Sequence, residues 1–255
     1  MNVVERLVAG LRRDGQVVDL RMGVHWTALV AELPDGSWVA GLASTQFAEG
    51  NAHGATAVRD AGRLIGRSAA DLAQWAASPS APERSIGFAA INALQEVDLS
   101  GCITLNAEEM IADRGKGRNV VIVGHFPFVP HVREVAKQLW VLELNPQAGD
   151  LHASQAGDVI PQADVVAITG MSLVNGTFEG LATLTRPDAF VTVLGPTTPL
   201  SDVLFDYGVD VVSGTLVTDI EAVLVAASQG AHFRQMAGRR LVTIARPDAK
   251  SGVAQ

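Results

Sequence analysis

Short, nearly continuous runs of apolar and β-branched residues recur through the second half of the chain, with segments of helical spacing between them. Such a run is typical of a strand covered on both faces, as in a parallel sheet between two layers of helices. Because crossovers between parallel strands are right-handed, the pattern predicts a Rossmann-like α/β domain with a doubly wound parallel sheet. The expected strands are 120–123, 140–144, 164–168, 190–194, 209–212 and 241–244, and the expected helices lie near 130–138, 176–185, 200–207 and 218–229.

The first hundred residues have a different order of predicted elements, with strands first and helices after them. Residues 34–37 have the composition of a turn, so two of these strands are expected to form a hairpin. Strands followed by helices indicate a small α+β unit. The polar connector that follows places the expected boundary between domains of residues 1–100 and 101–255. The expected elements of the first domain are strands 17–22, 26–31 and 38–42 and a helix over 82–97.

Composition narrows the function classes. The 255 residues include 48% hydrophobic and 18% charged residues, as in folded proteins, and the net charge of −8 argues against a nucleic-acid partner. Cys102 is the single cysteine and cannot form an internal disulfide, which favours a reducing cytoplasm. Charges interrupt the first ten residues, so they read as an amphipathic helix and not as a signal peptide, and no run reaches the roughly 18 apolar residues of a membrane span.

Four loops are expected to carry the chemistry. In an open parallel sheet, the loops that leave the carboxyl ends of the strands line one crevice, beside the free N–H groups of the helices that follow. The four loops are therefore expected to face the same ligand site. They comprise residues 124–127, 143–146, 169–177 and 195–199.

Gly124 and Glu143 follow the first two strands of the predicted parallel sheet. Gly124 allows either a close approach by a ligand or simply a tight turn, and the missing second and third glycines of G-x-G-x-x-G argue against a dinucleotide. Glu143 could accept hydrogen bonds from a ribose, or it could cap its own turn or pair with a basic residue. The two loops are similar to the S-adenosylmethionine site of class I methyltransferase-type folds, which makes an S-adenosylmethionine-dependent transferase one alternative.

Two further polar loops could contribute to a ligand site. Asn175 and Thr177 flank a glycine before a predicted helix, where they would meet a carboxylate or phosphate, or serve only as a helix cap. Thr197 and Thr198 lie between two prolines, which stiffen the loop.

The histidines lack the i, i+4 spacing of a metal-binding helix. His125 is set apart because it lies in the first crevice loop. A divalent transition metal would fit there if folding brought in further oxygen and nitrogen donors from Glu49, His53, Asp150 and His152. No motif for covalent catalysis is present, so whether the chain is an enzyme stays open.

The same loops resemble the putative heavy-metal chelation family, whose members join an enolase N-terminal-like domain to a Rossmann-like domain. The resemblance rests on V-G-H-F-P at 123–127, E-L-N-P at 143–146 with G-D at 149–150, T-G-M-S-L-V-N-G-T at 169–177, G-P-T-T-P-L at 195–200, and shorter matches at 23–27, 41–44 and 87–93. It implies a shared site between the two domains and brings Asn92 into it, although Asn92 alone would read as a polar residue on the solvent side of its helix.

Together these observations predict a protein that binds a small anionic or metal-linked ligand in an interdomain cleft, with a role in heavy-metal chelation or in making chelators. The S-adenosylmethionine-dependent transferase and a non-catalytic small-molecule-binding module are the alternatives. A homodimer is compatible with the sequence, but no self-complementary patch identifies one. The expected ligand-binding residues are Asn92, Gly124, His125, Phe126, Glu143, Asn145, Thr169, Gly170, Asn175, Thr177, Gly195, Thr197 and Thr198, with His125 also the candidate metal ligand.

Overall fold

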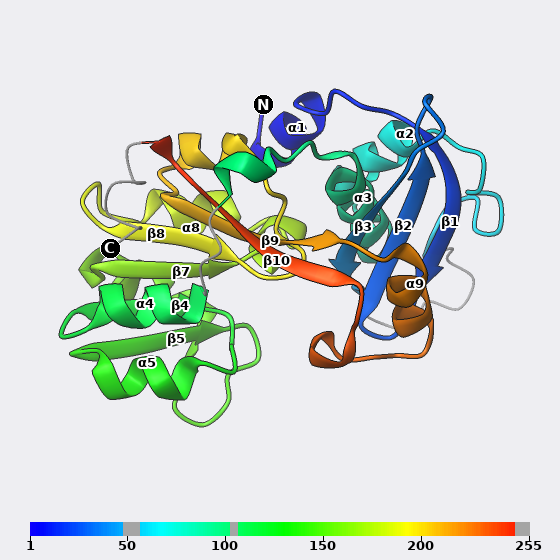
Figure 1. Ribbon diagram of the computed structural model, residues 1–255. Helices are drawn as coiled ribbons and strands as arrows, with labels where there is room; N and C mark the ends of the chain where they lie inside the picture. Colours follow the sequence, from blue (N-terminus) through cyan, green and yellow to red (C-terminus); the bar gives the residue numbers. More distant parts are fainter. Residues whose placement is uncertain (48–56, 103–106, 248–255) are drawn as a thin grey trace.

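A three-stranded antiparallel sheet and a seven-stranded, mostly parallel sheet form the two parts of the computed structural model, which describes residues 1–47, 57–102 and 107–247 (Figure 1). This arrangement confirms the predicted fold class, with a small antiparallel sheet followed by a larger, mostly parallel α/β sheet. We call residues 3–94 the small-sheet unit and residues 107–245 the large-sheet unit. No helix among the described residues has the length and apolar composition to cross a membrane.

The small-sheet unit pairs its strands in the order β1-β2-β3. The predicted hairpin turn is present between β2 and β3, where Asp35 accepts hydrogen bonds from the backbone and hydroxyl of Ser37 and Gly36 adopts a φ of 82°. The elements are α1 (Val3–Ala9), β1 (Gln16–Met22), β2 (Trp26–Glu32), β3 (Trp38–Ser44), α2 (Ala69–Ala73), η1 (Gln74–Ala77) and α3 (Ala81–Leu94), followed by η2 (Leu99–Gly101).

Helix α3 packs closely on β3 and on η1 because a glycine lies at each contact. A Cβ added at Gly41 of β3 would lie 2.1 Å from the carbonyl oxygen of Ala89, and one added at Gly87 would lie 2.0 Å from the backbone nitrogen of Ala76. Backbones can approach this closely only where no side chain intervenes. The helix begins with Pro82 in its first turn, as predicted, and ends at Leu94, three residues before the predicted end.

The large sheet has the strand order β10-β9-β8-β7-β4-β5-β6. All neighbouring pairs are parallel except β10 and β9. The last predicted strand therefore runs opposite to the parallel direction expected from the sequence. The strands are β4 (Asn119–Val123), β5 (Gln138–Glu143), β6 (Leu151–His152), β7 (Val165–Thr169), β8 (Phe190–Leu194), β9 (Val211–Val217) and β10 (Arg239–Ala245).

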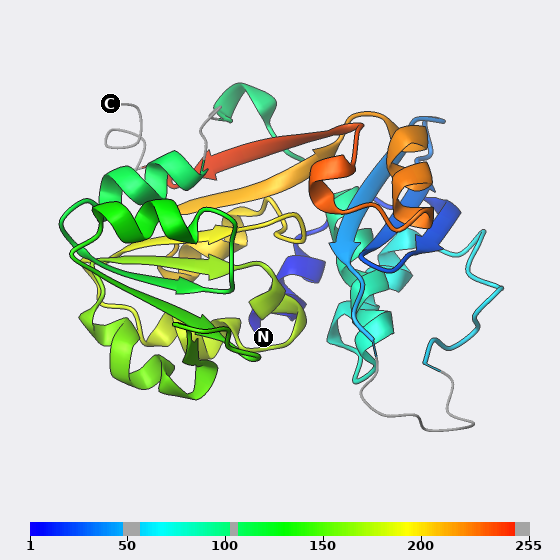
Figure 2. The same cartoon turned by 90° about the horizontal axis from the view of Figure 1, so that it is seen from below.

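Both faces of the large sheet are covered, as the apolar strands predict. Helices lie on both sides of its strands (Figure 2). Val120 and Ile122 of β4 pack with α4 and α5, whereas Val121 and Val123 belong to the opposite cluster, which contains Phe178 of α8. The predicted helix near 200–207 is instead the 3-10 helix η5. The helical elements are α4 (Ala107–Gly115), α5 (Val129–Val135), η3 (Ala153–Gln155), α6 (Ala156–Val159), η4 (Ile160–Gln162), α7 (Met171–Val174), α8 (Phe178–Thr183), η5 (Asp202–Tyr207), α9 (Ile220–Ser228) and η6 (Phe233–Gln235).

Helix α9 does not cover the large sheet, although the sequence pattern predicted that it would. It leaves the large sheet and packs on the small one (Figure 2). There Val223 and Leu224 join the apolar cluster of Trp26 and Val30. Strand β2 has a second apolar face, and burying that face favours this position. Because α9 crosses to the small-sheet unit before the chain returns, the next strand re-enters beside β9 in the antiparallel direction.

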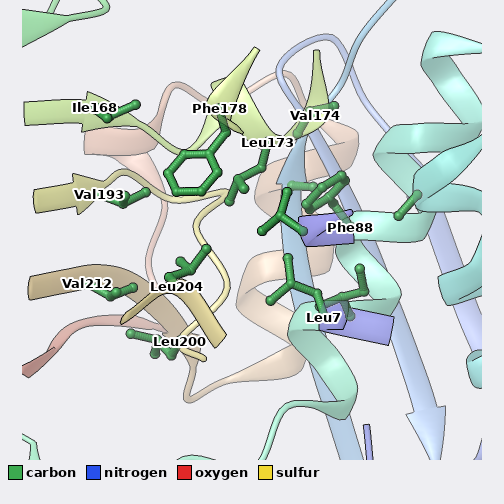
Figure 3. Packing of buried hydrophobic residues seen from close by; sticks show 14 of the residues in the cluster. Leu7, Phe88, Ile168, Leu173, Val174, Phe178, Val193, Leu200, Leu204 and Val212 are labelled. Atoms are coloured by element: carbon green, nitrogen blue, oxygen red, sulfur yellow. The ribbon is translucent and has the colours of Figure 1, made fainter. Parts of the chain in front are cut away.

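The two units share one hydrophobic core across their contact. Leu7 and Phe88 of the small-sheet unit lie in the same cluster as Leu173, Val174 and Phe178 of the large-sheet unit (Figure 3). These side chains are all nearly or fully buried. The carboxyl edge of the large sheet, where the candidate loops lie, is therefore partly covered by the small-sheet unit.

Candidate functional site

The loops that follow β4, β7 and β8 lie side by side at the carboxyl edge of the large sheet. A Cβ added at Gly124 would lie 3.0 Å from Cβ of Thr169, and one added at Gly170 would lie 2.3 Å from the Thr198 hydroxyl. The loop after β5 joins this row through Glu143, which accepts a hydrogen bond from the backbone of His125. The structure thus brings the four predicted loops together at one edge.

Gly124 makes the turn that leaves β4. Its φ is 101°, in the left-handed region that favours glycine, and its N–H donates to the carbonyl oxygen of Leu142 at 2.9 Å. The tight turn that the sequence offered as one explanation of Gly124 is present. Phe126 follows it and stacks on Phe128 with ring centroids 5.0 Å apart, so this ring packs within the loop.

Glu143 has the capping role that the sequence left as one of two possibilities. Its Oε1 accepts from the backbone N–H of His125 at 2.6 Å, and its Oε2 accepts from the backbone N–H of Leu144 at 3.1 Å. A carboxylate that accepts backbone N–H groups at both oxygens fixes the path of the chain. Glu143 therefore holds the His125 loop against the end of β5.

His125 is oriented by a buried carboxylate. Its Nδ1 lies 3.0 Å from Oδ2 of Asp150, whose side chain is 2% exposed, whereas the His125 side chain is 33% exposed. The same Asp150 oxygen accepts from the backbone N–H of Gln147 at 3.1 Å. An ionised carboxylate only accepts hydrogen bonds, so Nδ1 of His125 carries the proton and Nε2 of a neutral ring keeps its lone pair.

The other candidate metal ligands do not join this pair in the part of the chain that is described. Residues 1–47, 57–102 and 107–247 contain no group of three or more His, Cys, Asp or Glu side chains placed to hold a metal ion. His152 instead contacts the hydroxyl of Ser154 at 2.8 Å within its own turn. Glu49 and His53 lie outside the described residues, and Asn145 is exposed on the β5 loop.

The loop after β8 joins the two units. Oγ1 of Thr197 accepts from the backbone N–H of Ser44 at 2.9 Å, and its carbonyl oxygen accepts from Nδ2 of Asn92 at 3.1 Å. Asn92 also donates to the carbonyl oxygen of Leu42 at 2.8 Å. Asn92 therefore faces the other unit, as the family resemblance implied, and the alternative of a solvent-facing residue is wrong.

Thr198 and Gly195 complete this loop. Thr198 is 1% exposed, and its hydroxyl has no hydrogen-bond partner within the described structure. Gly195 has a φ of 124°, and its N–H donates to the carbonyl oxygen of Ser213 at 3.1 Å. These residues are packed between strands and the small-sheet unit.

The loop after β7 forms two consecutive turns. Oγ1 of Thr169 accepts from the backbone N–H of Met171 at 3.3 Å, at the start of α7. Asn175 ends α7, and its Oδ1 accepts from both the backbone N–H and the hydroxyl of Thr177, at 3.1 and 2.7 Å. Thr177 is the residue before α8, which confirms that this triplet opens a helix, although its hydroxyl binds Asn175 and does not cap α8.

A cavity of about 320 Å³ lies where Asn175 and Gly176 meet the small-sheet unit. Arg84 of α3 and Glu179 of α8 also line it. No sequence pattern predicted a role for either residue, because each stands singly on a helix far from the other along the chain. Ser44 contacts Thr197 of the other unit, and no role was predicted for its side chain. It ends one of the segments that carry the family resemblance.

Comparisons with known proteins agree over almost the whole chain. A family model described as putative heavy-metal chelation matches residues 106–246, more than half of the chain, and a second model with the same description matches residues 4–95. An uncharacterized protein of Methanocaldococcus jannaschii is 24% identical over 229 residues, which cover 86% of this chain and 85% of the relative.

Two crystal structures of proteins of unknown function from the DUF364 family are similar to the whole structure. The protein from Desulfitobacterium hafniense is 28% identical with a TM-score of 0.78, and the alignment covers 96% of this chain and 97% of that chain. The protein from Pyrococcus horikoshii is 22% identical with a TM-score of 0.80, and the alignment covers 96% and 98% of the two chains. With both sequence segments matched and the fold shared, this chain belongs to the family described as putative heavy-metal chelation.

Proposed function

We propose that this protein binds a small metal–chelator complex at the carboxyl edge of its large sheet, beside the contact between the two units, and that it acts in handling heavy-metal chelates. The metal is cargo in this proposal, carried by an anionic organic ligand. His125 supplies one ligand to it through Nε2. The observation that carries the proposal is the hydrogen bond between Nδ1 of His125 and the buried carboxylate of Asp150.

The donor chemistry of the pair fits a transition metal. Metal-binding histidines commonly donate their second ring nitrogen to a carboxylate, which fixes the tautomer and raises the basicity of the ligating nitrogen. Asp150 occupies that position, and Glu143 holds the backbone of His125. Asp150 and Glu143 are therefore positioning residues, and imidazole suits nickel, copper, zinc and iron.

A chelated metal fits better than a bare ion. Within the described ranges no further His, Cys, Asp or Glu completes a three-ligand group with His125. A single imidazole holds a bare divalent ion weakly, but it can fill an open position on a metal whose other ligands come from a chelator. The exposed Asn145 lies on the neighbouring loop, where it could contact the polar part of such a chelator.

Isothermal titration of tag-free protein with nickel nitrilotriacetate tests the proposal, because this complex leaves open coordination positions for a histidine. We expect wild-type protein to bind it and His125→Ala to lose at least about tenfold in affinity. Asp150→Asn should weaken binding less, since the ring remains but is no longer fixed. His131→Ala is the matched control, because His131 also lies near a carboxylate, Oε1 of Glu108 at 3.3 Å, on an exposed helix.

Equal binding by wild-type protein and His125→Ala would overturn the proposal, as would an equal loss in His131→Ala. Titration with S-adenosylhomocysteine examines the transferase alternative. Glu143 already accepts two backbone N–H groups, so Glu143→Ala would be expected to disturb the loop itself. Tight binding of S-adenosylhomocysteine that competes with nickel nitrilotriacetate would replace the chelate proposal.

A further inference from the structure

The cavity of about 320 Å³ lies at the contact between the two units, and His125 is not among its lining residues. Its walls come from the start of α1, from η1 and α3, and from the segment that joins α7 to α8. Leu173, Val174 and Phe178 also line it but are almost fully buried in the shared core (Figure 3). The accessible apolar surface of the cavity therefore comes from Val4 and Ala77. The volume is at the lower end of the range for ligand pockets, so the cavity suits a small molecule.

Arg84 brings a positive charge to this cavity. Its Nη1 donates to the carbonyl oxygens of Ser78 and Pro79 at 3.1 and 2.9 Å, and its Nε is buried without an acceptor. No carboxylate among the described residues forms an ion pair with Arg84. Because arginine stays protonated and its remaining nitrogen, Nη2, has no acceptor in the described structure, the guanidinium can still bind a carboxylate.

Glu179 brings a negative charge to the same cavity. Its Oε1 accepts from the backbone N–H of Val3 at 3.1 Å, which attaches α8 to the start of α1. No ion pair joins Glu179 to Arg84, although both side chains line the cavity. The carboxylate also disfavours ligands with several negative charges, such as phosphates, through repulsion.

We infer that this cavity binds a small zwitterion, an α-amino acid with an apolar side chain. Arg84 binds its carboxylate, Glu179 binds its ammonium group, and the apolar surface of Val4 and Ala77 contacts its side chain. A ligand with both charges gives each of these groups an opposite charge at once, whereas a simple anion leaves Glu179 without one and a simple cation leaves Arg84 without one. The site is separate from His125, and the inference does not depend on the chelate proposal.

Calorimetric titration with L-leucine tests the inference, with 4-methylpentanoate and 3-methylbutylamine as probes that lack the ammonium and the carboxylate. We expect L-leucine to bind and each single-charge probe to bind at least about tenfold more weakly, since a charge-assisted hydrogen bond is worth about 1.5–3 kcal/mol. Glu179→Gln keeps an oxygen for Val3 but removes the charge. It should therefore weaken binding of L-leucine, whereas 4-methylpentanoate should bind at least as tightly as to wild-type protein, because a repulsion between negative charges is removed.

Arg84→Met should abolish binding of L-leucine, with Arg133→Met on the exposed side of α5 as the control. If the loss of the Ser78 and Pro79 contacts unfolds Arg84→Met, Glu179→Gln still decides the question. The inference is overturned if wild-type protein does not bind L-leucine, if 4-methylpentanoate binds as tightly, or if Glu179→Gln binds L-leucine as well as wild-type protein does.

Discussion

Thr197 and Ser44 connect the two units directly, because the hydroxyl of Thr197 in the large-sheet unit accepts the backbone N–H of Ser44 at the end of β3, at 2.9 Å. The Ser44 hydroxyl lies 3.0 Å from the same oxygen. Thr197 is 2% exposed, so water is a poor substitute for either contact.

Thr197→Val should therefore lower the free energy of unfolding by about 1–3 kcal/mol, since it keeps the shape of the side chain and leaves a partly buried N–H without its acceptor. Urea denaturation followed by circular dichroism measures this change. Thr183→Val is the control, because Thr183 is exposed on α8 and should change stability by less than about 0.5 kcal/mol. Equal free energies of unfolding for the two variants would contradict a stabilising hydrogen bond between Thr197 and Ser44.

Asn92→Asp should destabilise the protein at neutral pH more than Asn92→Ala does. The amide donates to two carbonyl oxygens, of Leu42 and Thr197, and a carboxylate would place negative charge against both. We expect a loss of about 3 kcal/mol or more. The two carbonyl oxygens raise the pKa of the new carboxyl in the folded protein. The extra loss of stability in Asn92→Asp, relative to Asn92→Ala, should therefore disappear as pH falls through that native pKa. Unfolding curves of both variants at neutral and acidic pH provide the measurement.

Gly124→Ala should cost about 1–3 kcal/mol of unfolding free energy, because φ is 101° and the new Cβ would lie 3.0 Å from Cβ of Thr169. Gly117→Ala is the comparison, since Gly117 also has a positive φ, 68°, but no atom lies within 4 Å of the added Cβ. The difference in denaturation midpoint between the two variants reports crowding at the strand edge. A smaller effect at Gly124 than at Gly117 would count against the close contact.

Asp164 should make stability fall in acid. The backbone N–H of Asn119, at 2.9 Å, and the guanidinium of Arg186, at 3.0 Å, lower the pKa of the Asp164 carboxyl from its ordinary value. Its contribution is therefore fully present above the unfolded pKa of about 3.9 and is lost as pH falls through the lower native pKa. The stability difference between wild-type protein and Asp164→Asn should shrink between neutral pH and about pH 3, whereas the exposed Asp158→Asn should show little difference at either pH.

The local pattern of the sequence was enough to predict the large sheet and its loops. Segments such as 120–123 and 165–168 are apolar on both faces, and this property can be seen in the residues themselves. Because parallel strands end at a common edge, the prediction that Gly124, Thr169 and Gly195 lie at one edge followed from the parallel arrangement alone. The helix that starts after Thr177 was likewise predicted from the turn residues before it.

Contacts between distant segments could not be predicted from the sequence. The direction of β10 depends on where α9 packs, and the apolar residues of α9 do not indicate which of the two sheets they cover. The Asp150 carboxylate meets His125 through the course of an irregular loop, which has no period to follow. The placement of Arg84 and Glu179 at one cavity depends on how the two units dock, and this information is spread over many apolar residues.

Because α9 crosses to the small sheet, each half of the chain depends on the other to cover its apolar surface. A protease cut in the connector near residue 100 would leave β2 covered by a helix that belongs to the other fragment. The two fragments should therefore migrate together in size-exclusion chromatography under native conditions and separate only in denaturant. Each half expressed by itself would expose to water an apolar surface that the other half normally hides.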